Sequence, residues 1–174
     1  MGVCNLPQAC TCWGHNLGPE RDNLTDDIII EWDGYGNVTA RYVHGPGIDE
    51  PIAMYRSSHV YYYLHDIIGS IIGLTDENGS IAVSYTYDAW GSIISEQGGD
   101  IKNPYRFTAR EYDAESGLYF YRARYYDAVI GRFMQKDPEE SAWRNGEGLY
   151  IYCGDNPVNG KDPYGELTWR QWWY

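Results

Sequence analysis

Short segments rich in β-branched and aromatic residues recur along the chain and are separated by polar segments that contain Asp and Gly. The composition of the apolar segments favours strands, and no stretch keeps a 3.6-residue hydrophobic period over three turns. The pattern therefore predicts strands throughout, with one short helical turn over 139–144. The clearest strand candidates are Val60–Leu64, Ser80–Tyr87, Tyr119–Tyr126 and Leu149–Cys153.

The polar segments repeat a phrase in which an Asp, often after an aromatic residue, precedes a Gly by two or three intervening residues. An Asp carboxylate accepts hydrogen bonds from the backbone two residues on, and Gly supplies the positive φ that closes a turn. Each phrase therefore predicts a hairpin turn. The phrases are Trp32–Gly36, Asp66–Gly69, Asp76–Gly79, Tyr87–Gly91, Tyr112–Gly117 and Tyr126–Gly131.

Strands joined by repeated tight turns predict an all-β fold, built as a long, curved antiparallel meander rather than a compact sandwich. Tyr side chains in rows across neighbouring strands would supply the cross-strand contacts. Because the repeats are few, the sheet must end in edges that are covered or paired.

The composition of the chain disfavours several classes of binding partner. The 174 residues include 13 Lys and Arg against 25 Asp and Glu, a net charge of −12, with 18 Tyr and 7 Trp. Clustered cations are needed to bind phosphate backbones or anionic lipid, so nucleic acid and membrane surfaces are disfavoured as partners. We expect no membrane span, because no run of about 18 apolar residues occurs, and we expect no cofactor. The first residues do not form a recognisable signal peptide.

From Tyr61 onward, several motifs follow one another in a fixed order. They are Tyr87–Gly91, Asn103–Asp113, Glu115–Asp127, Gly131–Phe133, Asp137–Pro138, Tyr150–Tyr152, Asn156–Asn159 and Asp162–Gly165. With these motifs the chain resembles the repeat-associated core of the Rhs (rearrangement hotspot) or YD-repeat proteins. The resemblance divides the chain into a Cys-containing extension (1–23), a degraded repeat (24–60), the core (61–167) and an aromatic tail (168–174).

The resemblance implies a fold and a reaction. In the family, many repeats spiral into a hollow β-shell that encloses a toxin segment, so this chain would be a fragment of such a shell. Family cores often cut themselves with two Asp residues, which here match Asp137 and Asp162, and the cut would fall at Glu166 or Leu167. The motif after Asp137 lacks the expected Gly, however, and an Asp-Pro pair also caps turns. We favour turn capping.

The cysteines leave three readings open. Cys4, Cys10 and Cys12 lie close together and, with His15, could form a four-ligand zinc site. Alternatively, one of the three pairs with Cys153 in a disulfide, or all four remain free thiols.

Arg122 and Arg124 alternate within a predicted strand, which would place both on one face to pair with Asp or stack on Tyr. The tail is rich in aromatic residues, and such residues are costly to leave in water. We expect the tail to bind a neighbouring copy on a Tyr-rich face. The tail residues are Trp169, Trp172, Trp173 and Tyr174, and the receptor residues are Tyr119, Tyr121 and Tyr125.

These features predict a structural or interaction protein, not an enzyme, that assembles with copies of itself into an oligomer or an extracellular filament. The alternative is the core stub of a toxin-delivery shell, which would bind other YD-repeat shell segments. Either function places the protein outside the cell or at its surface.

Overall fold

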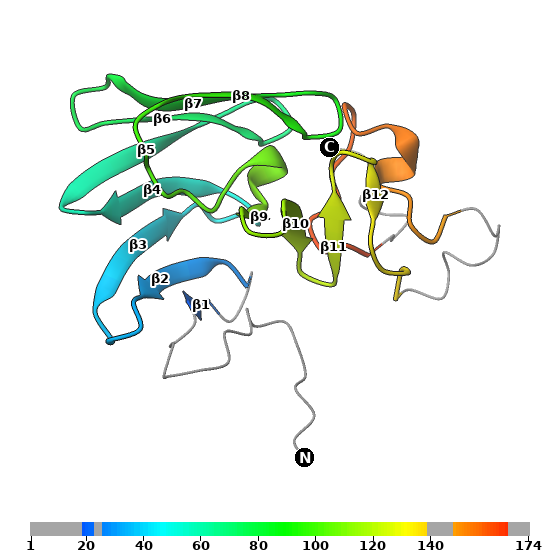
Figure 1. Cartoon of the computed structure of the whole chain (residues 1–174), viewed down its shortest axis with the longest axis horizontal. Coiled ribbons are helices and arrows are strands. Elements are labelled where there is room, and N and C mark those ends of the chain that lie inside the picture. The colour runs from blue at the N-terminus through cyan, green and yellow to red at the C-terminus, as the bar shows by residue number, and fades with distance from the viewer. Residues whose placement is uncertain (1–18, 23–25, 139–147, 167–174) are drawn as a thin grey trace, which may run out of the picture.

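The computed structural model describes residues 19–22, 26–138 and 148–166. Within these ranges the chain forms an eight-stranded antiparallel sheet, in which β1 to β8 follow one another in sequence order, and a four-stranded antiparallel sheet of β9 to β12 (Figure 1). The larger sheet is curved and does not close on itself. The predicted all-β, curved antiparallel meander is therefore confirmed.

Consecutive strands of the larger sheet pair with one another, so β2 to β7 each have two partner strands and β1 and β8 each have one. The boundary expected at 60/61 falls inside β5, so the degraded repeat and the start of the core share this one sheet. The strands are β1 (Glu20–Arg21), β2 (Ile28–Trp32), β3 (Val38–His44), β4 (Pro51–Arg56), β5 (His59–His65), β6 (Ile71–Thr75), β7 (Ile81–Tyr87) and β8 (Ile93–Gly98).

The hairpin turns form as the Asp–Gly phrases predict. The carboxylates of Asp33, Asp66, Asp76 and Asp88 each accept hydrogen bonds from the amides two and four residues later, at 2.7–3.0 Å. The glycine that ends each of the six phrases has φ between 67° and 92°. An L-residue with a Cβ is strained in that region, which explains why Gly recurs at this position.

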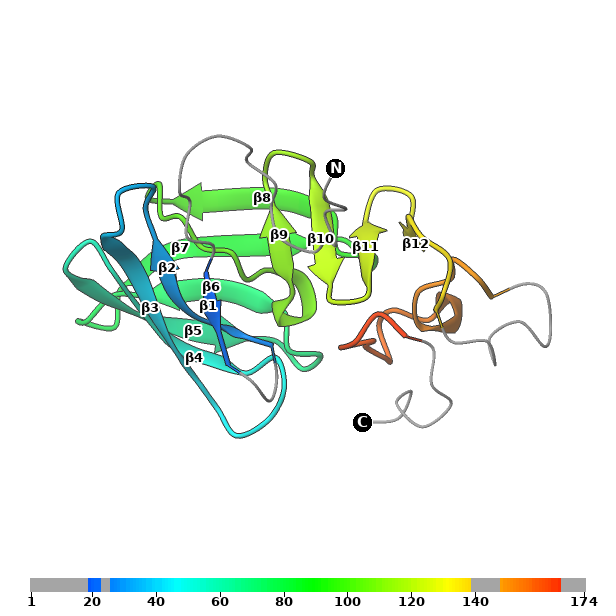
Figure 2. The same ribbon diagram turned by 90° about the horizontal axis from the view of Figure 1, so that it is seen from below.

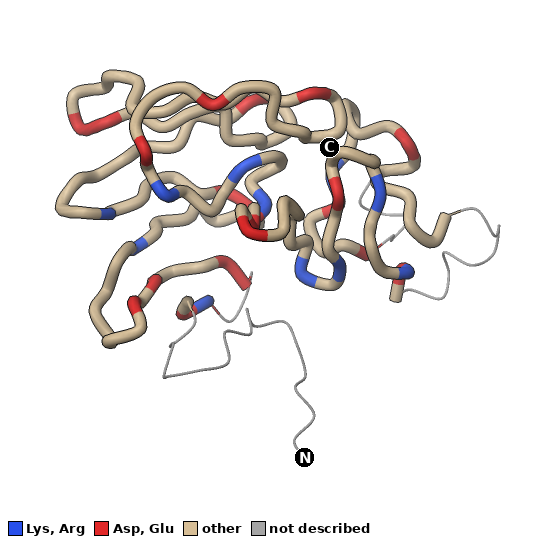
Figure 3. The backbone as a smooth tube through the Cα atoms, viewed as in Figure 1, with Lys and Arg blue, Asp and Glu red and all other residues tan. Residues whose placement is uncertain are grey.

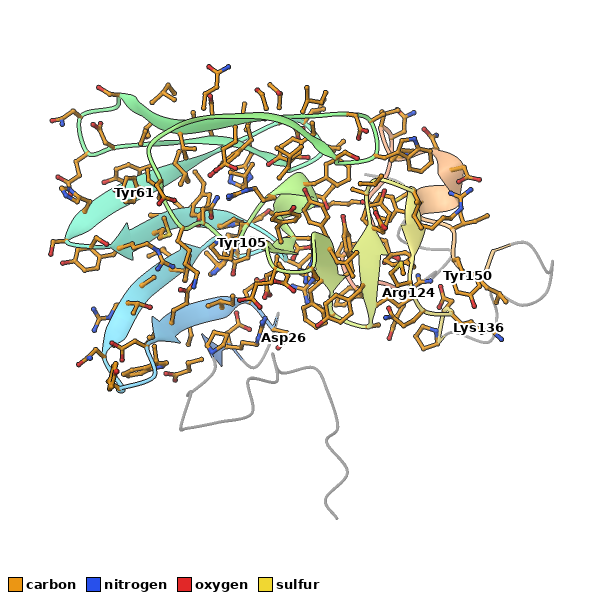
Figure 4. All side chains as sticks on the ribbon, in the orientation of Figure 1. Asp26, Tyr61, Tyr105, Arg124, Lys136 and Tyr150 are labelled. Atoms are coloured by element: carbon orange, nitrogen blue, oxygen red, sulfur yellow. The ribbon has the colours of Figure 1, made fainter. Side chains whose placement is uncertain are left out.

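The segment between β8 and β9 turns back beneath the eight-stranded sheet (Figures 1 and 2). Its Tyr105 is fully buried, and its ring lies 5.6 Å from Tyr42 and 6.1 Å from Tyr63. The Tyr105 hydroxyl accepts a hydrogen bond from the Ile28 amide at 3.1 Å. This residue, labelled in Figure 4, therefore joins β2, β3 and β5 to the returning segment.

The four-stranded sheet is made of short strands. The predicted strand over 119–126 is wrong, because the chain turns back at Arg122, whose φ is 58°. A residue distant in sequence stabilises that turn: the Ala123 amide donates a hydrogen bond to the Tyr164 carbonyl at 3.2 Å. The helical turn expected over 139–144 lies outside the described residues. The strands are β9 (Glu111–Asp113), β10 (Leu118–Tyr121), β11 (Arg124–Asp127) and β12 (Arg132–Phe133), with short 3₁₀ turns η1 (Phe107–Ala109) and η3 (Cys153–Asp155).

Candidate functional site

Arg124 is the central side chain of the candidate site. It is the first residue of β11, it is 1% exposed, and its guanidinium carbon lies 3.6 Å from the centre of the Phe133 ring. Figure 4 labels it within the four-stranded sheet. A buried guanidinium needs both an aromatic or apolar surface and anionic partners to offset its desolvation.

The two Asp residues predicted as a pair meet at this guanidinium. Nη2 of Arg124 lies 2.9 Å from Oδ2 of Asp137 and 3.3 Å from Oδ2 of Asp162, and both Asp side chains are buried. Asp137 follows β12, and Asp162 belongs to the last described segment of the chain. Arg124 thus joins two carboxylates that are distant in sequence, as the expected Arg–Asp pairing implied.

Arg124 also fixes the backbone of the second Asp-Pro motif. Its Nε donates to the Gly165 carbonyl at 2.6 Å, and the Asp162 carboxylate accepts the Glu166 amide at 3.1 Å. Gly165 has φ +65°, and a Cβ there would lie 2.3 Å from the Tyr121 carbonyl oxygen. The motif therefore needs Gly for its close approach to β10 as well as for its turn.

Burial sets the electrostatics of the site. The pKa of Asp162 is raised overall from 3.8 to about 6. Burial is the main cause and the neighbouring Asp137 adds to it, whereas Arg124 and the Glu166 amide act in the opposite direction. Burial also lowers the pKa of Arg124. Asp162 can consequently take up a proton under mildly acidic conditions.

Two chemical uses fit this arrangement to different degrees. An aspartic dyad works when two carboxylates share one proton, so that one is acid and the other base. Here one guanidinium nitrogen lies within reach of both carboxylates, so the two carboxylates share a single positive charge. This geometry favours an ion bridge that closes residues 162–166 onto β11. A turn-capping contact is present at Asp162, whose carboxylate accepts the Glu166 amide.

Tyr119 and Tyr121 are 1% and 0% exposed and pack inside the core of the four-stranded sheet. The prediction that they form an accessible receptor face is therefore wrong, because their rings already fill the chain's own interior. Tyr125 is half-buried against Phe120. The other predicted site residues near this end, Leu167, Trp169, Trp172, Trp173 and Tyr174, lie outside the described residues.

Cys153 is a buried free thiol, and burial raises its pKa to about 12. Its proposed disulfide partners, Cys4, Cys10 and Cys12, and the fourth zinc candidate, His15, lie outside the described residues. Within residues 19–22, 26–138 and 148–166, no group of three or more His, Cys, Asp and Glu side chains is arranged to hold a metal ion.

A second buried charge cluster connects the two sheets. Nη1 of Arg110 lies 2.5 Å from Asp49, and Nη2 of Arg122 lies 2.9 Å from both Asp27 and Asp49. Figure 3 shows basic positions gathered in the returning segment and the four-stranded sheet, while acidic positions are spread over the outer loops. The predicted pairing of Arg122 with Asp is thereby confirmed, but the sequence pattern did not identify Asp27 and Asp49 as the partners or Arg110 as a member of the cluster.

Comparisons with known proteins identify the family. The sequence model of the Teneurin YD-shell family matches residues 49–157. The chain belongs to the YD-shell family. The resemblance to the Rhs or YD-repeat core is thereby confirmed, and the YD-shell fold is that of a shell-like structural domain.

Individual relatives are much longer than this chain. The tRNA nuclease WapA of Bacillus subtilis (strain 168) is 34% identical over 149 residues, which are 82% of this chain and 6% of that protein. Salivary gland surface protein 1 of Aedes aegypti is 36% identical over 138 residues, 76% of this chain and 4% of that protein.

Among solved structures, the crystal structure of TcdB2-TccC3-TEV superposes with a TM-score of 0.63 at 23% identity, over 77% of this chain and 7% of that one. This likeness shows the fold. In the part of the chain that the structure describes, no helix has the length and apolarity of a bilayer-spanning segment.

Proposed function

We propose that this chain is a structural segment of a YD shell, not an enzyme, and that further YD strands pair with the edges of its eight-stranded sheet. The observation that carries the proposal is the strand order, which leaves β1 and β8 at the two ends of an open sheet. Unpaired edge amides and carbonyls are templates for another strand. The chain also spans only 6% of the WapA length, which leaves room for many more repeats in such relatives.

The partners we propose are copies of this chain or other YD-repeat shell segments. Head-to-tail pairing of copies would build an oligomer or a filament, depending on whether the rotation closes. The names of two relatives, a tRNA nuclease and a salivary gland surface protein, support a toxin-related role and an extracellular or cell-surface location for this chain.

The test compares two exposed isoleucines in different strands. Ile94 is 67% exposed on β8, at the sheet edge, and Ile81 is 60% exposed on β7, which is paired on both sides. A Lys on an edge strand blocks strand addition. We expect Ile94→Lys to reduce assembly in size-exclusion chromatography with light scattering, and Ile81→Lys to leave it unchanged.

The proposal fails if the chain is a 20.0 kDa monomer at every concentration and also fails to bind a separately produced YD-repeat segment. Equal assembly of wild type, Ile94→Lys and Ile81→Lys contradicts the role of the β8 edge specifically.

A second candidate function is self-cleavage near Glu166 and Leu167. The arrangement around Asp162 favours it. Asp162 and Asp137 both contact Arg124, and the Asp162 carboxylate accepts a hydrogen bond from the Glu166 amide. The pKa of Asp162 is raised to about 6. Intact mass tests this function. Loss of the segment after Glu166 or Leu167 in wild type, but not in Asp137→Asn, supports cleavage, and full-length mass in both contradicts it.

A further inference from the structure

An open groove of about 980 Å³ lies at one end of the eight-stranded sheet. Its walls are the loop 45–50 between β3 and β4, the turn 66–69 between β5 and β6, and the segment 160–164. Most of the lining is apolar, which is typical of a surface that receives another apolar segment. The main apolar residues are Ile48, Ile52, Tyr63, Ile67, Ile68 and Tyr164.

Ile67 distinguishes this groove from the other turns. In the other five Asp–Gly phrases the residue after Asp is Gly, Ala or Glu, whereas here it is an isoleucine that is fully exposed. The turn itself is made by the Asp66 carboxylate, which accepts the amides of Ile68 and Ser70. The Ile67 side chain adds nothing to that turn. It lines the groove together with the other apolar residues of the walls, and a continuous apolar surface of this kind is typical of a binding site.

The segment 168–174 carries three Trp and one Tyr and begins two residues after Glu166, the last residue that the structure describes. The last described residues, which lead into this segment, lie beside the groove, because Tyr164 lines the groove and the Gly165 carbonyl accepts a hydrogen bond from Arg124 at 2.6 Å. Eight residues from 167 onward reach up to roughly 26 Å when extended.

We propose that residues 168–174 lie in this groove of their own chain. Three observations support own-chain docking over a neighbouring copy. The described residues that lead into the segment lie at the groove rim, so the effective concentration of the segment there would be high. The Trp side chains match the apolar walls. The groove lining holds the carboxylates of Glu50 and Asp66 beside the cation of Lys161, and Arg170 is complementary to the two carboxylates. The docked segment would be a cap for the sheet end.

Arg170 also provides the test, because trypsin cleaves after Arg and needs a locally open chain. Release of residues 171–174 from the full-length protein can be followed by intact mass. We expect trypsin to release residues 171–174 about tenfold more slowly from wild type than from Ile67→Glu, because cleavage after Arg170 requires the segment 168–174 to leave the groove. The matched control is Val129→Glu, at another Asp–Gly turn outside the groove, where Val129 is 83% exposed. It should match wild type.

Two outcomes overturn the proposal. Equal release rates for wild type and Ile67→Glu, with both proteins folded by circular dichroism, mean that the segment does not occupy the groove. A wild-type rate that falls as protein concentration rises means that the segment docks on a second copy. Neither outcome depends on edge pairing of β1 or β8, so the proposed shell function is tested separately.

Discussion

The two sheets of this chain are held together in different ways. In the eight-stranded sheet, consecutive hairpins pair along their length over a mixed interior, in which fully buried aliphatic residues such as Met54, Leu74 and Val83 pack with Tyr rings. The four-stranded sheet has strands of two to four residues, and its interior is a cluster of Tyr and Phe rings around buried Arg side chains. Short strands supply few ladder hydrogen bonds, so that region depends on long-range ion pairs and ring packing.

The largest expected effect comes from removing the central cation of the four-stranded region. Arg124→Ala leaves Asp137 and Asp162 buried without the guanidinium that both contact. Breaking a buried ion pair on one side costs about 3–5 kcal/mol. We expect a loss of this size in the free energy of unfolding, measured by urea denaturation.

The matched control is Arg132→Ala. Arg132 pairs with Asp155 at 2.5 Å, but the two side chains are 39% and 47% exposed. Exposed ion pairs contribute about 0–1 kcal/mol, so this variant should remain close to wild type. Equal losses for Arg124→Ala and Arg132→Ala would contradict the distinction between the buried bridge and the surface pair.

Two turn glycines, Gly91 and Gly79, end the same Asp–Gly phrase but have different surroundings, so the cost of replacing each by Ala can be compared. Gly91 has φ +92°, and a Cβ there would lie 2.4 Å from the Phe107 ring, whereas Gly79 has φ +79° and open space around it. Gly79→Ala should cost about 1 kcal/mol from left-handed strain alone. Gly91→Ala should cost about 3 kcal/mol, because overpacking adds to that strain. Thermal unfolding of the two variants measures the difference, and equal shifts would show that the Phe107 contact relaxes freely.

Asp162 predicts a pH dependence. Its folded pKa of about 6 lies above the ordinary 3.8, so the folded state prefers the protonated form. This group therefore lowers stability above pH 6, and the loss is recovered as pH falls from 6 towards 3.8. We expect the stability of wild type relative to Asp162→Asn to rise by about 2 kcal/mol over that range. A flat difference in urea denaturation at several pH values would contradict the raised pKa.

The comparison also shows which features the sequence could predict. The hairpin turns follow from local chemistry, since the Asp66 carboxylate and the Gly69 φ act within one turn. The turn at Arg122 follows from distant groups, Asp27, Asp49 and the Tyr164 carbonyl, so the segment was wrongly predicted to continue as a strand.

The candidate site was predictable in part for the same reason. The family resemblance placed Asp137 and Asp162 together, and the structure brings them to one guanidinium. No local pattern could identify Arg124 as the shared partner, because the contact depends on how three distant segments pack. Likewise, the burial of Tyr119 and Tyr121 depends on η1 and η3, neither of which the sequence predicted.

The smallest effect is expected for a single Asx turn in the eight-stranded sheet. The Asp76 carboxylate accepts the amides of Asn78 and Ser80 at 2.8 and 2.9 Å, and these hydrogen bonds lower its pKa below 3.8. The stabilisation is therefore present above pH 3.8 and is lost as pH falls through the lowered folded value. Asp76→Ala should lower the melting temperature less than Gly79→Ala does, because water replaces the lost carboxylate contacts at this exposed tip. Asp76→Asn should retain most of the stability, since Asn forms the same turn. Only the wild type should lose the contribution of this turn on acidification, so the melting temperatures of wild type and Asp76→Ala should converge below pH 3.8. If they stay apart, the side chain stabilises the hairpin through something other than its charged carboxylate.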